Sequence, residues 1–156
     1  MSLNEVKLFF KEHGREADVV ELNESSATVD LAANALDVLP GRIAKTLAVW
    51  SNDEPILLVI AGDHKLNNSK FKKEFNQRMS MLKFKEVEEI TGHPVGGVCP
   101  FGNNNGLPIY LDISLKAYDT IFPACGSENS MIELTPEELE KYSYCEKWID
   151  VAIAYD

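Results

Sequence analysis

Two apolar runs separated by a short polar turn constrain the fold of this chain more than any other feature. The runs are Ile43 to Trp50 and Ile56 to Ile60, and the turn between them is Ser51-Asn52-Asp53-Glu54. This arrangement predicts a β-hairpin. Because neither run alternates apolar with polar residues, we expect both faces of the hairpin to be covered, which places it at the centre of a sheet.

Helix signals occur in four places. Capping-box patterns at Ser2 and Thr135 each open a helix, Thr28 can cap a second one, and a basic helix is expected from about Ser69. The second helix is expected to end at Pro40-Gly41. The apolar positions expected to face inward are Val6, Phe9, Phe10, Val29, Ala32, Ala33, Leu36, Phe71, Phe75 and Met79.

Shorter apolar runs predict further strands at Ala17 to Leu22, Pro108 to Ile113 and Asp150 to Ala154. Hairpins mixed with helices at irregular spacing indicate an α+β fold with a mixed, mostly antiparallel central sheet and surrounding helices. No linker or repeat divides the chain, so we expect one compact domain over residues 1–156. A chain of this length buries roughly 68–70% of its unfolded surface, which is enough for a core without disulfide or metal.

The net charge of −10 would on average repel nucleic acid. The segment between Lys65 and Lys85 differs, because it holds seven basic residues against the single acid Glu74, a local charge of +6. Its lysines Lys70, Lys72 and Lys73 are either a solvated helix face, which composition alone favours, or a track for phosphates.

The three cysteines, spaced by 26 and 20 residues, fit neither a zinc ligand pattern nor a disulfide framework, so a reducing cytoplasm is expected. The longest apolar run, Ile56 to Ala61, is far too short for a membrane span. Cys99 with His93 as its base is one hypothesis for a thiol nucleophile, but a free cysteine is more often a small buried hydrophobe. No Ser/His/Asp pattern, P-loop or metal spacing is present in the sequence.

The segment from Thr91 to Gly106 contains five of the nine glycines. Such a loop can bind a ligand through its main chain, or it can be a long surface loop that needs turns. Lys45 interrupts an apolar strand and is either an anchor for a phosphate or carboxylate or an outward residue on a half-exposed strand. Asp112 closes a strand and can orient an amine or pair with a lysine.

Several of these features occur together and in order, and their combination resembles the YbaK/EbsC family. That family includes the editing domain of prolyl-tRNA synthetase and free-standing relatives that hydrolyse mischarged aminoacyl-tRNA. The resemblance runs from about Ala27 to Ile153. The segments that carry it are Thr28-Val29, Ala32-Ala33, Ile43-Ala44-Lys45-Thr46-Leu47, Gly62-Asp63, Ile90-Thr91-Gly92, Gly96-Gly97-Val98-Cys99-Pro100-Phe101-Gly102, Asp112 and Gly126-Ser127.

The resemblance implies roles for particular residues. Lys45 matches the lysine that holds the tRNA 3′ end, and Cys99 stands where many relatives have serine. The implied catalytic set is Lys45, Gly96, Gly97 and Cys99. The implied substrate-binding set is Thr46, Val98, Pro100, Gly102, Asp112, Gly126 and Ser127.

The function implied is that of a free-standing, metal-independent and cofactor-independent deacylase acting on a tRNA with a small wrong amino acid. It would position a water molecule and stabilise the oxyanion with loop N–H groups, because the ester is already activated. Its partners would be aminoacyl-tRNA and, as a further candidate, an aminoacyl-tRNA synthetase. Two alternatives stay open: a non-catalytic module that binds an acceptor end, a nucleotide or a protein, and a cysteine-dependent hydrolase.

Overall fold

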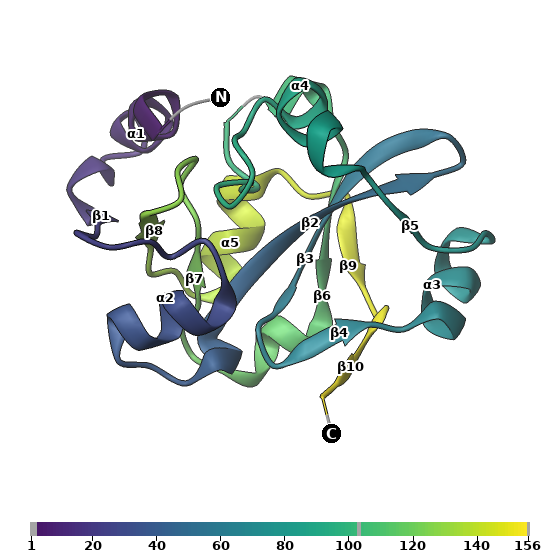
Figure 1. Cartoon of the computed structure of the whole chain (residues 1–156). Helices are drawn as coiled ribbons and strands as arrows, with labels where there is room; N and C mark the ends of the chain where they lie inside the picture. The colour runs from purple at the N-terminus through teal and green to yellow at the C-terminus, as the bar shows by residue number, and fades with distance from the viewer. Residues whose placement is uncertain (1–2, 103, 156) are drawn as a thin grey trace.

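The computed structural model describes residues 3–102 and 104–155, which form a mixed sheet with helices around it (Figure 1). The helices are α1 (Leu3–Glu12), α2 (Val29–Leu36), α3 (Asn68–Phe75), α4 (Val87–Thr91) and α5 (Pro136–Ser143). The strands are β1 (Val19–Glu21), β2 (Ile43–Ser51), β3 (Glu54–Ala61), β4 (His64–Leu66), β5 (Ser80–Met81), β6 (Ile109–Asp112), β7 (Phe122–Pro123), β8 (Ser130–Ile132), β9 (Lys147–Ile149) and β10 (Ala152–Ala154).

The central sheet has the strand order β5-β2-β3-β6-β9, and β7 pairs with the outer edge of β2. Its longest pairing is the antiparallel β2–β3 hairpin, while β6, β7 and β9 join in parallel. Two small antiparallel sheets, β1–β8 and β4–β10, lie outside it. The expected α+β class with one mixed sheet is thereby confirmed.

The hairpin is the centre of the molecule, as its sequence predicts. Its two-residue turn places Asn52 and Asp53 at positive φ, the conformation that matches the twist of the flanking strands. Successive β3 residues contact different cores. Leu57 and Val59 pack with α1 and α5, whereas Leu58 packs with Phe71 of α3. Both faces of β3 are therefore covered, which explains its uninterrupted apolar sequence.

The helix starts agree with the capping patterns. The Thr28 hydroxyl accepts a hydrogen bond from the Leu31 N–H at 3.1 Å, and Thr135 forms the expected capping box with Glu138. The predicted cap Ser2 lies outside the described residues. The end predicted for α2 at Pro40-Gly41 is wrong, because Asp37 adopts the left-handed conformation that terminates the helix after Leu36.

The ends of the other elements also differ from the expectation in places. The basic helix α3 ends at Phe75, since Asn76 is left-handed, although Met79 still packs against the same core. The strand expected from Asp150 is shorter and forms β10, and the preceding β9 was not expected. Within residues 3–102 and 104–155, no helix combines the length and apolar character needed to cross a bilayer.

Candidate functional site

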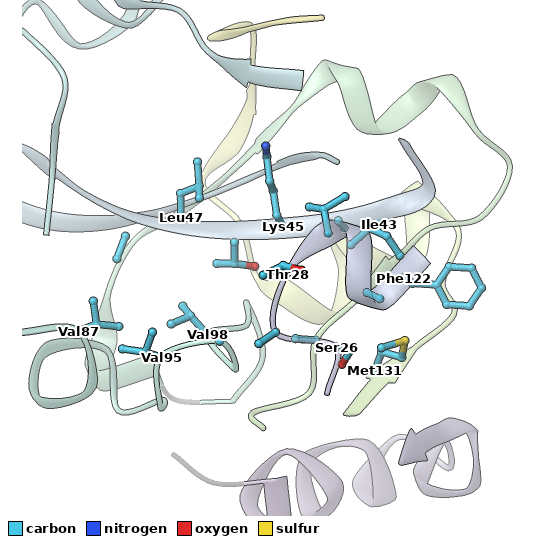
Figure 2. Close-up of a pocket in the computed structure, with 18 of the residues that line it drawn as sticks. Ser26, Thr28, Ile43, Lys45, Leu47, Val87, Val95, Val98, Phe122 and Met131 are labelled. Atoms are coloured by element: carbon cyan, nitrogen blue, oxygen red, sulfur yellow. The ribbon is translucent and has the colours of Figure 1, made fainter. Parts of the chain in front are cut away.

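The outer edge of β2 is open in its middle. β7 pairs with β2 at Ile43 and Ala44, and β5 pairs with it at Val49 and Trp50. Among the described residues no strand pairs with this edge between those two points. A cavity of about 360 Å³ lies against the gap, and its walls come from β2, the start of α2, the glycine-rich loop and β8. Most of the side chains around it are apolar (Figure 2).

Thr46 lies in the wall of this cavity with unused polar groups. The Gly62 N–H donates to the Ile43 carbonyl at 2.7 Å, so alternate residues from Ile43 onward bond to β3. The N–H and C=O of Thr46 consequently point to the open edge. Its hydroxyl oxygen is buried and has no hydrogen-bond partner within the described part of the chain. A buried polar group in this state requires an explanation, and a ligand is one.

Lys45 lies at the boundary between this cavity and a second one. Its side chain points away from Val95 and Val98 (Figure 2), although the residue lines the first cavity. The second cavity, of about 490 Å³, is also lined by Gly62, Asp63 and Tyr155. The Lys45 ammonium lies 3.4 Å from the Tyr155 hydroxyl and makes no ion pair with any described carboxylate. It is therefore available to an anionic ligand.

The glycine-rich loop approaches its neighbours more closely than a side chain would allow. Gly96 has φ +85° and lines the cavity, and a Cβ there would lie 2.9 Å from the Ala27 Cβ. A Cβ on Gly97 would lie 2.8 Å from three backbone atoms of Ser127. The loop thus packs directly on the Gly126-Ser127 turn. Ser127 in turn donates a 2.6 Å hydrogen bond to Ser130, which lines the cavity.

The structure brings together only part of the residue set implied by the sequence. Lys45, Thr46, Gly96 and Val98 line the first cavity. Gly97 and Ser127 support its wall through the contact between loop and turn. Neither cavity is lined by the remaining members of the set, which are Cys99, Pro100, Gly102, Asp112 and Gly126.

Cys99 and Asp112 are buried and serve the core. The Cys99 sulfur lies 3.7 Å from His93 Nε2, and burial raises the pKa of its thiol to about 12, so the thiol is protonated at neutral pH. The Asp112 carboxylate accepts the N–H of Ser114 at 2.9 Å and of Val151 at 2.7 Å. These two bonds fix the end of β6 to the segment before β10.

The basic lysines of α3 lie apart from the first cavity, because α3 and α2 are on opposite sides of the hairpin (Figure 1). Lys70 pairs with Asp150 at 2.8 Å, whereas Lys72 and Lys73 are exposed. Nowhere in the described ranges do three His, Cys, Asp or Glu side chains gather closely enough to hold a metal ion.

Tyr155 is the main site residue that the sequence did not indicate. It stands alone in an unremarkable polar stretch, and only the pairing of β10 with β4 brings it to Lys45. Ser26 and Ala27 also line the first cavity without having been predicted. Gly62-Asp63 carried a signal, because it belongs to the segments that resemble the family.

Fold and cavity together define a protein of the aminoacyl-tRNA editing type. Residues 23–142 match the family model described as the aminoacyl-tRNA editing domain. The chain therefore belongs to this family, and the predicted resemblance to YbaK/EbsC proteins is confirmed.

Three similar proteins illustrate the relationship. YwhH of Bacillus subtilis (strain 168) is 50% identical over 152 residues, which is 97% of each chain. EbsC of Enterococcus faecalis, named as a candidate Cys-tRNA(Pro)/Cys-tRNA(Cys) deacylase, is 33% identical over 119 residues, covering 75% of this chain and 73% of EbsC. A solved structure described as a candidate trans-editing enzyme for prolyl-tRNA synthetase superposes with a TM-score of 0.85, at 29% identity and 97% coverage of both chains.

Proposed function

We propose that this protein is a free-standing trans-editing hydrolase that removes a small, wrongly attached amino acid from the 3′ end of a tRNA. Membership of the editing-domain family supports this proposal, as do the names of EbsC and of the trans-editing enzyme. In this proposal residues 1–156 act as one domain in the cytoplasm. Aminoacyl-tRNA is the substrate, and an aminoacyl-tRNA synthetase is a further candidate partner.

The observation that carries the proposal is the position of Lys45 between two cavities. The end of a charged tRNA also has two parts, an aminoacyl ester and the nucleotide to which it is attached. We assign the aminoacyl group to the largely apolar first cavity. The terminal nucleotide then lies in the second cavity, where the Lys45 ammonium can meet its phosphate or ribose oxygens.

The open edge of β2 offers the polar groups that ester hydrolysis needs. Water attacks the carbonyl carbon, the bond from that carbon to the ribose oxygen breaks, and the ribose oxygen takes up a proton. Main-chain N–H groups of Thr46 and of the loop at Gly96 are candidates to stabilise the oxyanion. No protein nucleophile takes part, which agrees with the protonated, buried thiol of Cys99.

The Thr46 hydroxyl contributes to holding the substrate. It is buried behind the cavity wall, and rotation about its Cα–Cβ bond exchanges the positions of hydroxyl and methyl group. A bound ester or its water would give the hydroxyl the hydrogen bond that the described residues do not supply.

The basic face of α3 is our candidate contact for the tRNA backbone. Lys72 and Lys73 are exposed and lie in a helix with a basic surface on a protein of net charge −10. Phosphate contacts of this kind position a nucleic acid without reading its sequence.

The test is a deacylation screen with the purified protein. A panel of tRNAs, each carrying a small amino acid that does not match it, is incubated with the protein in the presence and absence of EDTA. We expect at least one ester to be hydrolysed faster than in buffer, equally with and without chelator. Binding of charged tRNA without hydrolysis of any ester would instead identify a non-catalytic module of the same fold.

A further inference from the structure

Tyr155 presents a held aromatic ring at the second cavity. It follows β10, and its N–H donates to the Asp63 carbonyl at 3.0 Å. The adjoining pair Ala154 and His64 belongs to the β4–β10 ladder, so the backbone at Tyr155 is fixed on both sides of the cavity floor. The residue is nevertheless 55% exposed. A large ring that is anchored through its backbone but left open to solvent is suited to contact a planar ligand.

Two lysines flank this ring. The ammonium of Lys45 lies 5.2 Å from the ring centroid, and that of Lys65 on β4 lies 5.8 Å from it. Among the described residues neither lysine forms an ion pair. Lysine ammonium groups stand on flexible stems, so each can leave the ring for a phosphate and expose a ring face in doing so.

The acid at this cavity is already engaged. One Asp63 oxygen lies 2.7 Å from His64 Nδ1, and the other accepts from the Tyr118 hydroxyl at 3.5 Å. The free groups near Tyr155 are therefore an aromatic face and two cations. An aromatic face stacks on a nucleobase, and cations contact the phosphates beside it.

We propose that Tyr155 is a stacking platform for the terminal base of the tRNA 3′ end. The inference rests on the proposed function, because it takes the second cavity as the place of the terminal nucleotide. With the base on Tyr155, the sugar lies beside Lys45 and the attached ester faces the open edge of β2. Tyr155 is thus a positioning residue that touches the nucleotide but not the reacting atoms.

The experiment compares Tyr155→Leu and Tyr155→Phe with the unchanged protein. Tyr144→Leu is the matched control, since Tyr144 is also exposed, at 67%, but packs near Phe9 away from both cavities. Two readouts are used. One is KM and kcat for the responsive charged tRNA. The other is the Kd for an uncharged acceptor-stem hairpin that ends either in adenosine or in an abasic ribose.

Loss of the stack is expected to raise KM and the Kd for the adenosine hairpin by roughly 5- to 150-fold in Tyr155→Leu, while kcat changes little. Tyr155→Phe and Tyr144→Leu should keep values close to those of the parent. On the abasic hairpin the parent and Tyr155→Leu should bind alike, because the base that stacks is absent.

Three results would overturn the proposal. They are unchanged binding in Tyr155→Leu, an equal loss on the adenosine and abasic hairpins, and failure of phenylalanine to restore binding, which would assign the effect to the hydroxyl beside Lys45. Failure of the proposed function is a separate result, since a protein that hydrolyses no ester can still show or lack the base-dependent binding of the hairpin.

Discussion

Thr46→Val should stabilise the protein and slow ester hydrolysis at the same time. The two side chains have nearly the same shape, so no cavity opens. Removing the buried, unpartnered hydroxyl relieves a desolvation cost of about 1–3 kcal/mol. For a chain of this size each kcal/mol corresponds to roughly 2–4 °C in Tm. If the hydroxyl bonds substrate, its loss also lowers kcat/KM by about 2- to 12-fold, equivalent to about 0.5–1.5 kcal/mol.

Thermal unfolding and steady-state deacylation measure the two effects. Thr91→Val is the matched control, because the buried Thr91 hydroxyl donates to the Val87 carbonyl at 2.7 Å and accepts the His93 N–H at 3.1 Å. That variant should lose about 1–3 kcal/mol of stability. A lower Tm in Thr46→Val would show that its hydroxyl is bonded in the free protein. Unchanged kcat/KM would remove Thr46 from the substrate contacts.

Three further predictions test other parts of the site. Gly97→Ala should lower both stability, by about 1–3 kcal/mol, and activity, since its Cβ would lie 2.8 Å from backbone atoms of the neighbouring turn; Gly106→Ala, with nothing within 4 Å, should keep activity. Cys99→Ser should retain turnover, and in the native protein Cys99 should resist alkylation at pH 8 because its pKa is about 12; loss of turnover with normal folding would revive the thiol nucleophile. Changing Lys72 and Lys73 to glutamine should reduce the slope of log K against log salt for tRNA binding by roughly 0.7–0.9 per contact, with kcat unchanged; an unchanged slope would make α3 only a solvated helix.

Local rules account for what the sequence could predict of the fold. The hairpin was predictable because its turn residues and its apolar strands agree, and the Thr28 and Thr135 caps were predictable because a single side chain satisfies an N–H within its own helix turn. The end of α2 was missed because Pro40 is a stronger visible signal than a left-handed aspartate at position 37.

The site was less predictable, because long-range pairing builds it. The open edge of β2 exists only because β7 and β5 stop short of each other, and both strands are two residues long. Resemblance to the family identified Lys45 and the glycine loop. It could not reveal that Cys99 is turned into the core, or that Tyr155 reaches Lys45 from more than a hundred positions away.

The most direct test of the central claim is the deacylation rate of Lys45→Ala on the tRNA that responds in the screen. Lys11→Ala, an exposed lysine on α1, is the control. Losing a charge-assisted contact worth about 1.5–3 kcal/mol should lower kcat/KM by roughly 10- to 150-fold, while Tm stays close to that of the parent. A Lys45→Ala protein that hydrolyses the ester at the parental rate would contradict the account, because the lysine between the two cavities would then hold no part of the substrate.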